Sequence, residues 1–293
     1  MPVRVNDRLL LDAAERAAGG ARSFTARQLY YATCGLLEGP EVSAAGGQIA
    51  LGAVLLALGL VFTALTSVYI IFVVAIGAAV LGRGLQNRRL ERSQPRTRPL
   101  PLGFEEFLAA VAPHRAAIAG LLDESALTEA PPPDAAAALL ICDRPETAAV
   151  LRDNAAASGL RLWPVSEAGA SGLVSGRRVY ALHDADREGC ALPLRVHDAG
   201  AAEVVDLGLR PSDVLDHGVQ VIEGAPMLLA TELARLLSPD DIIWLADGRR
   251  VELAILPTGQ LVEGLSRALA ADALPAPGGA TPGISVAGSR LLS

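Results

Sequence analysis

The chain of 293 residues contains no lysine, so every one of its 25 basic side chains is an arginine. This absence excludes Schiff-base chemistry on a lysine, and it excludes a phosphate-binding loop that ends in Gly-Lys. Aromatic residues make up only 4% of the chain while hydrophobic residues make up 51%, so alanine, leucine and valine supply most of the apolar content.

Cysteine and histidine are also scarce, at three and four residues. Cys34, Cys142 and Cys190 are far apart in sequence, which excludes a zinc knuckle and argues against a disulfide framework. No two histidines stand in an HExxH or i,i+4 arrangement. A zinc hydrolase is therefore not indicated.

Charged residues are absent from Val42 to Gly82. That run is about twice the roughly 20 apolar residues that one bilayer-spanning helix needs. We therefore expect a transmembrane helical hairpin over residues 42–86; a single long span and a buried pair of helices are the alternatives. Six arginines follow between residues 83 and 98, and positive loops face the cytoplasm. The expected location is the plasma (inner) membrane, with both termini cytoplasmic and the lipid bilayer as a partner.

Composition divides the remaining chain into four parts. Residues 1–41 have the pattern of a short helical segment, and residues 87–133 that of a basic juxtamembrane linker followed by a helix. Residues 134–272 alternate between strand and helix patterns, which favours an α/β domain built on a parallel sheet. Residues 273–293 are rich in proline, glycine, alanine and serine, and this composition predicts a disordered tail.

Four short apolar runs in the α/β domain have the character of buried strands, at residues 137–142, 160–165, 179–183 and 203–207. Helical patterns are found at residues 146–158, 227–237 and 260–271. Asp247-Gly248 is a preferred two-residue hairpin turn. It predicts a β-hairpin formed by residues 242–246 and 249–256.

Acidic residues follow two of the predicted strands. One strand leads directly into Asp184 and Asp186, and another leads into Asp143, with Glu146 three residues later. Because the carboxyl ends of parallel strands meet at the functional edge of a sheet, these acids are expected to lie close together. Mg²⁺ prefers carboxylate oxygens. Asp184, Asp186 and Asp143 are therefore candidate metal ligands and Mg²⁺ the expected cofactor, unless Asp184 or Asp186 instead caps a helix.

The phrase Asp184-Ala-Asp-Arg-Glu-Gly189 is similar to the Asp-Pro-Asp-Arg-Glu-Gly signature of type IA topoisomerases. With the preceding strand and the upstream acid, it resembles the Toprim domain of topoisomerases, primases and related nucleases. In that family a Glu follows the first strand and an Asp-x-Asp follows the third. The resemblance implies Mg²⁺-dependent phosphoryl chemistry, with Glu146 or Asp143 in the place of the family Glu as third ligand or general base. Arg187 and Arg144 are the candidate phosphate contacts, because a guanidinium matches phosphate geometry.

The segment Ser23-Phe-Thr-Ala-Arg-Gln-Leu-Tyr-Tyr31 resembles the Thr-x-Arg-x-x-Tyr-Tyr segment of the topoisomerase VI A subunit family. In that family a winged-helix domain precedes a Toprim domain, and the second tyrosine attacks the DNA phosphodiester. The resemblance implies that residues 1–41 are a winged-helix-like fragment and that Tyr31 is a catalytic nucleophile. The alternative is that Thr25 caps an ordinary helix whose apolar face packs on the helix before it.

Two functions of different classes follow from these patterns. The first is a membrane-anchored, Toprim-like enzyme with Mg²⁺-dependent chemistry on nucleic acid or a nucleotide. The second is a non-catalytic inner-membrane scaffold that binds a ligand or a protein partner. Residues 99–293 carry 14 arginines against 26 acidic residues, and this balance disfavours nucleic acid as the partner.

Overall fold

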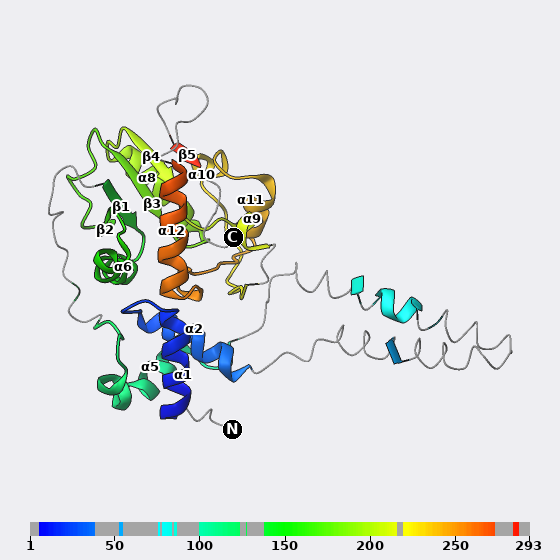
Figure 1. The fold of residues 1–293 in the computed structure, drawn as a ribbon. Coiled ribbons are helices and arrows are strands. Elements are labelled where there is room, and N and C mark those ends of the chain that lie inside the picture. Colours follow the sequence, from blue (N-terminus) through cyan, green and yellow to red (C-terminus); the bar gives the residue numbers. More distant parts are fainter. Residues whose placement is uncertain are drawn as a thin grey trace. The chain divides into compact units, whose positions relative to one another are not determined.

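The computed structural model describes residues 6–38, 53–54, 76, 78–83, 85–86, 100–123, 127, 138–215, 219–272 and 284–286. The chain divides into two compact units, of which the first comprises residues 1–37, 96–214 and 219–293 and the second residues 38–95 and 215–218. Every residue of the candidate site described below belongs to the first unit (Figure 1).

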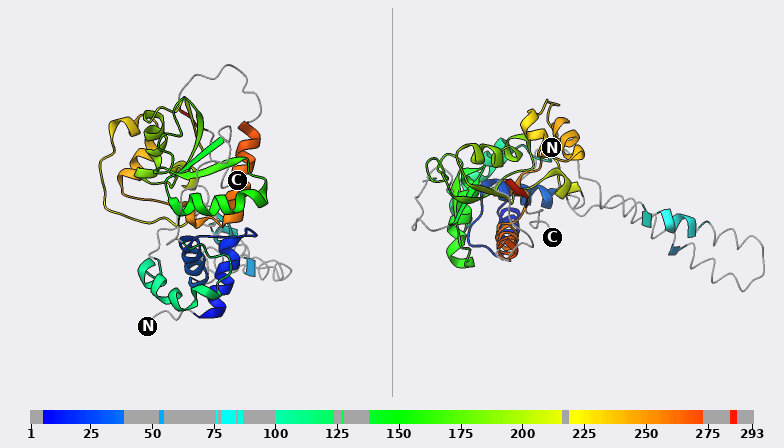
Figure 2. Two further views of the ribbon diagram at one scale, coloured as in Figure 1. Left: turned by 90° about the vertical axis from the view of Figure 1, so that its left-hand side faces the viewer. Right: turned by 90° about the horizontal axis from the view of Figure 1, so that it is seen from above.

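A five-stranded sheet, in the order β2-β1-β3-β4-β5, forms the centre of the first unit (Figures 1 and 2). Its strands are β1 (Ala138–Cys142), β2 (Leu162–Ser166), β3 (Arg178–Leu182), β4 (Glu203–Asp206) and β5 (Ile284–Val286). All four neighbouring pairs are parallel. Since β1 and β3 are neighbours, the residues that follow them emerge side by side.

Helices connect the strands and follow them. They are α6 (Pro145–Ser158), α7 (Arg187–Cys190), α8 (Leu192–Asp198), α9 (Pro211–Leu215), α10 (Thr231–Ala234), α11 (Pro239–Ala246) and α12 (Thr258–Asp272). Helix α6 links β1 to β2; it has Pro145 in its first turn and ends at Gly159, whose φ of 66° lies in the left-handed region that glycine favours. The core of the sheet is aliphatic, with Leu139, Ile141 and Val179 fully buried. Burial on both faces explains why these strands read as continuous apolar runs.

The N-terminal helices form a second core. It is built from α1 (Asp7–Ala18), α2 (Ala26–Leu37) and α5 (Phe104–Val111), with Ile118, which follows the 3₁₀ helix η2 (Ala112–Ala117). Leu10, Leu29, Tyr30 and Phe107 are buried together in it, and the Tyr30 hydroxyl donates to the carbonyl of Leu102 at 2.7 Å. Helix α2 also contacts η4 (Leu253–Ile255), which comes from the α/β part of the chain.

The predicted parallel α/β domain is confirmed by β1 to β4, which match the four apolar runs to within two residues at each end. The helix predicted over residues 260–271 is α12, whereas that predicted over 227–237 is reduced to α10. The strand β5 lies within the tail that was expected to be disordered and pairs with β4.

The predicted hairpin of residues 242–246 and 249–256 is wrong, because residues 239–246 form helix α11. A capping box starts this helix: the Ser238 hydroxyl accepts from the Asp241 amide, and the Asp241 carboxylate accepts from the Ser238 amide. Asp247-Gly248 therefore follows a helix rather than joining two strands. Residues 250 and 251 make only isolated bridges, to Ile222 and Ala185.

The transmembrane hairpin predicted over residues 42–86 is wrong by the structure: within the described residues, no helix is long and apolar enough to cross a membrane. The longest helical stretch described there is residues 78–83, about 9 Å of helix against a hydrocarbon core of about 30 Å. Most of the predicted hairpin lies outside the described residues. The expected inner-membrane location and the bilayer as a partner depended on this hairpin and are corrected with it.

Candidate functional site

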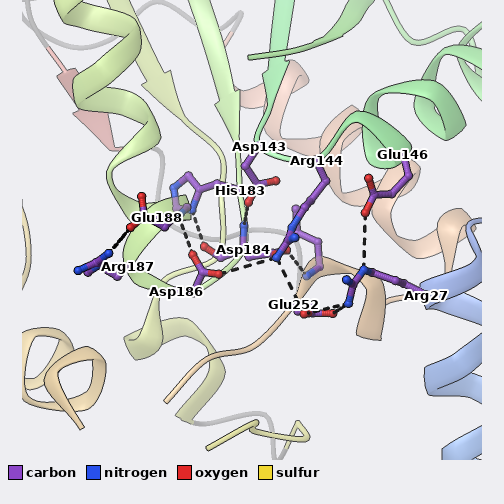
Figure 3. A network of polar contacts seen from close by, with 12 residues as sticks. Arg27, Asp143, Arg144, Glu146, His183, Asp184, Asp186, Arg187, Glu188 and Glu252 are labelled. Carbon is purple, nitrogen blue, oxygen red and sulfur yellow. Dashed lines mark hydrogen bonds and ion pairs between the residues drawn. The ribbon is translucent and has the colours of Figure 1, made fainter. Parts of the chain in front are cut away.

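Three of the predicted acids meet where β1 and β3 end (Figure 3). Asp143 is the first residue after β1, and Asp184 and Asp186 follow β3. The amide of Asp143 extends the ladder by donating to the carbonyl of Leu182 at 3.1 Å. In return, Asp143 Oδ2 accepts a hydrogen bond from the Asp184 amide at 2.8 Å. Pairing of neighbouring parallel strands thus brings these two acids together.

Asp184 is the most buried acid of the three, at 2% exposure. Its Oδ1 accepts from the amide of Leu253 at 2.7 Å, and its Oδ2 accepts from Arg144 Nε at 3.1 Å. Burial, followed by the charge of Asp143, raises the pKa of Asp184 to about 8, although Leu253 and Arg144 act in the opposite direction. Asp184 therefore holds a proton more tightly than an ordinary aspartate.

Asp143 has one oxygen without a partner. Among the described residues, nothing donates a hydrogen bond to its Oδ1, and this atom is buried. Burial raises the pKa of Asp143 to about 6, against the opposing effects of the Asp184 amide, His183 and Arg144. A buried carboxylate oxygen without a donor or cation is costly, because it has lost its water.

Asp186 caps the short helix α7. Its Oδ1 accepts from the amide of Gly189 at 2.6 Å, so the capping alternative holds for this residue. Gly189 is required here because a side chain would overlap the carbonyl of Asp184. Arg187, in the same phrase, extends outward and pairs with Glu188 (Figure 3). The second oxygen of Asp186 lies 4.0 Å from Arg144 Nη2.

Glu252 belongs to the site although the sequence did not single it out. It is 3% exposed and accepts from Arg27 Nη1, at 3.1 Å to Oε2 and 3.3 Å to Oε1. Its Oε1 also lies 3.9 Å from Arg144 Nη2. The available signal was a single acid in the apolar run Val251-Glu-Leu-Ala-Ile-Leu256, where a buried charge needs a partner.

Tyr31, the expected nucleophile, is hydrogen-bonded to Glu252 in this structure. Its hydroxyl donates to Glu252 Oε2 at 2.9 Å, and its side chain is buried. Burial and the charge of Glu252 raise the pKa of Tyr31 well above its ordinary value. Arg27 and Tyr31 stand four residues apart on α2, so both reach the same acid.

The rest of the Tyr-Tyr segment is structural. Thr25 and Gln28 form a capping box at the start of α2, with each side chain accepting from the amide of the other residue. Gln28 also donates to the carbonyl of Leu256 at 3.0 Å, and Thr258 donates to Gln28 at 2.9 Å. The helix-cap interpretation of Thr25 therefore agrees with the geometry, and the cap doubles as a tie to residues 256–258.

Glu146 lies apart from the other acids, in the first turn of α6, with its Oε1 3.6 Å from Arg27 Nε. It shares a small cavity with the acid cluster, lined among others by Arg27, Arg144, Asp184 and Glu252. The cavity measures about 10 Å³, which is room for about one water molecule. Glu146 therefore lines the same space as Asp184 and Glu252, with Arg27 between it and Glu252.

A buried polar chain supports the end of β3. His183 contacts the Asp184 carbonyl through Nδ1 at 2.7 Å and Asp206 Oδ1 through Nε2 at 3.0 Å. Arg210 binds the other oxygen of Asp206 at 2.9 Å. Burial alone would raise the pKa of Asp206, but His183 and Arg210 outweigh it and lower the value to about 2. This chain fixes the backbone that presents Asp184.

Within the described residues, no group of three or more His, Cys, Asp and Glu side chains is arranged to hold a metal ion. The arginines Arg27 and Arg144 lie between the acids instead (Figure 3). Comparison with protein-family models, with curated proteins and with solved structures finds no match.

Proposed function

We propose that this chain binds Mg²⁺ at the acids that follow β1 and β3 and carries out phosphoryl or phosphodiester chemistry on a nucleotide or nucleic acid, as the Toprim resemblance implies. The observation that carries this proposal is the buried Asp143 Oδ1, which has no partner among the described residues and lies beside Asp184. A divalent cation would supply the missing positive charge.

The donors present fit such an ion. Asp143, Asp184 and Asp186 offer carboxylate oxygens, which suit Mg²⁺, and the ion needs only one or two of them because it retains water and phosphate oxygens. When bound, the ion would stabilise negative charge on the oxygens around phosphorus. The small cavity is too small for a substrate. Phosphate would therefore approach from the side where Arg187 is exposed.

The remaining residues receive roles by their positions. Glu146 is the candidate general base, because it lines the water-sized cavity beside the acid cluster. Arg144 is the candidate phosphate contact, as a guanidinium already within reach of Asp184 and Asp186. Tyr31 serves to position Glu252, since a buried phenol bonded to a carboxylate is a poor nucleophile. Water is then the attacking group.

A second candidate is a non-catalytic module that binds a ligand or a protein partner. It is favoured by the ion pairs that Arg27 and Arg144 make with Glu252 and Asp184, which neutralise these acids without a metal. In that case the network holds α2 on the α/β part of the chain, and the resemblance to Toprim domains extends only to the fold.

Thermal unfolding of the full chain during titration with Mn²⁺ or Mg²⁺ separates the two candidates. A specific ion should stabilise the protein by about 2.7 kcal/mol at a hundredfold excess over its Kd. Asp184→Asn should abolish this effect, whereas Asp12→Asn, at an exposed position on α1, should leave it unchanged. An unchanged melting temperature for the wild-type chain at every ion concentration would favour the non-catalytic module.

A further inference from the structure

Arg144 reaches three carboxylates at once. It is the N-cap residue of α6, in extended conformation with φ −112° and ψ 127°, and its guanidinium crosses from the end of β1 to the acids beyond β3 (Figure 3). Nε lies 3.1 Å from Asp184 Oδ2, while Nη2 lies 4.0 Å from Asp186 Oδ2 and 3.9 Å from Glu252 Oε1. These acids come from two separate segments, and the guanidinium is the positive group between them.

Resting on the proposed function, we propose that the Arg144 guanidinium occupies the cation position of the metal-free site and must leave when a divalent ion binds. The reason is competition for the same oxygens. A metal-ligating oxygen of Asp184 or Asp186 would lie about 2.1 Å from Mg²⁺, and Asp184 Oδ2 is the atom that now accepts from Arg144. A guanidinium and a divalent cation that contact the same carboxylate oxygen would also repel each other.

Of the two arginines in the cluster, Arg144 makes fewer hydrogen bonds and is the easier one to displace. Among the described residues, its guanidinium makes one hydrogen bond, to Asp184. Arg27 instead makes two hydrogen bonds to Glu252, pairs with Glu146 and lies over the ring of Phe104, 4.6 Å from the centroid. Arg27 therefore stays with Glu252 while Arg144 turns away.

The displaced guanidinium identifies the ligand class of the site. Once it leaves Asp184, Arg144 is an unpaired cation at the edge of a site that holds a divalent ion, and a phosphate group would pair with both. Metal and phosphate are then expected to bind with positive coupling, because the metal releases the residue that phosphate needs. An anionic ligand such as a phosphate ester, rather than a neutral sugar, is the substrate class that this arrangement favours.

Mn²⁺ binding to the full chain, measured by the electron paramagnetic resonance of free Mn²⁺, tests the competition. Arg144→Gln should lower the Kd for Mn²⁺ at least tenfold, because the internal competitor is gone. Arg178→Gln, which removes an exposed arginine at the start of β3 that is paired with Glu203, should leave the Kd unchanged. Inorganic phosphate should tighten Mn²⁺ binding to the wild type but not to Arg144→Gln. Circular dichroism of each variant checks that it is folded.

A measurement on the wild type needs no variant. Phenylglyoxal modifies accessible arginines, and mass spectrometry of the digested protein reports the extent at each position. Modification of Arg144 should increase severalfold when Mn²⁺ is added, while that of Arg27 should stay constant. Equal modification of Arg144 with and without bound Mn²⁺ would overturn the proposal.

The outcomes separate this inference from the proposed function. If the wild type binds Mn²⁺ and Arg144→Gln binds it equally or more weakly, Arg144 is not a competitor, and the proposed function stands without it. If only Arg144→Gln binds Mn²⁺, Arg144 does hold the cation position, and the wild-type chain is the non-catalytic module. If neither binds Mn²⁺, both proposals are wrong.

Discussion

Asp143 and Asp184 are neighbours at the ends of β1 and β3. The Asp184 amide donates to one oxygen of Asp143, and the other oxygen of Asp143 has no partner in the described part of the chain. The charged groups around this pair are Arg144, Asp186, Glu252 and His183. Two neighbouring buried carboxyls titrate together, because protonation of one changes the pKa of the other.

The pH dependence of stability follows from this pair. The folded-state pKa values, about 6 for Asp143 and about 8 for Asp184, exceed the ordinary aspartate pKa of 3.8. The folded state therefore binds protons more tightly than the unfolded state. The resulting stabilisation is complete below about pH 4 and is lost as the pH rises through 6 and 8.

Urea unfolding with a chelator present, at pH 5 and pH 8.5, measures this loss. The wild type should lose about 1–3 kcal/mol more than Asp143→Asn across this range, because one pKa unit corresponds to about 1.4 kcal/mol. The Asn side chain can still accept from the Asp184 amide, and His183 and Asp206 are common to both proteins. An equal change in the free energy of unfolding between the two pH values for both proteins would contradict the repulsion between Asp143 and Asp184.

At the scale of elements, α2 is held by polar side chains at its start and along one face. Gln28 bonds the carbonyl of Leu256, and Arg27 and Tyr31 both bond Glu252. These contacts join the helical core to the segment whose Leu253 amide donates a hydrogen bond to Asp184. Helix α2 therefore stabilises the acid cluster without contributing an acid to it.

Tyr31→Phe should lower the free energy of unfolding by about 1.5–3 kcal/mol, the range for a hydrogen bond to a charged group. Glu252 would keep its two bonds from Arg27, so the fold should persist and Mn²⁺ binding should change little. Chemical denaturation of both proteins at one pH gives the comparison. A loss of all metal binding in the variant would instead show that Tyr31 acts directly in the site.

The sequence predicts correctly those elements that are determined by residues close to one another in the chain. Buried parallel strands need continuous apolar runs, so β1 to β4 were found, together with the acids Asp143 and Asp184 at their ends. The hairpin at Asp247-Gly248 failed because the capping box at Ser238 starts a helix in the same segment. Glu252 and its role were missed because its partners, Arg27 and Tyr31, lie more than 220 residues earlier.

At the scale of the whole molecule, the N-terminal helices and the α/β part of the chain belong to one compact unit. Two glycines bring the ends of α1 and α12 together. An added Cβ at Gly259 would overlap the carbonyl of Gly19, and Gly19 itself has a φ of 54°. This contact allows backbone to lie against backbone, so no side chain fits between the two helices.

Gly259→Ala should therefore destabilise the protein by several kcal/mol, the effect of overpacking against a backbone that has no room to shift. Gly35→Ala is the matched control, because nothing lies within 4 Å of the added Cβ in α2. The control should stabilise the protein by up to about 1 kcal/mol, since alanine favours helix over glycine. Melting temperatures compare the two variants, and similar values would contradict the close contact.

The bond between Tyr31 and Glu252 joins residues 221 positions apart, and this separation has a consequence for folding on the ribosome. At a synthesis rate of about 5–20 residues per second, Glu252 is synthesised about ten seconds or more after α2. Helices α1 and α2 must pass that interval without Glu252, Leu256 or Thr258. We expect protease resistance of the nascent N-terminal helices to appear late, only after the segment around residue 252 has left the exit tunnel.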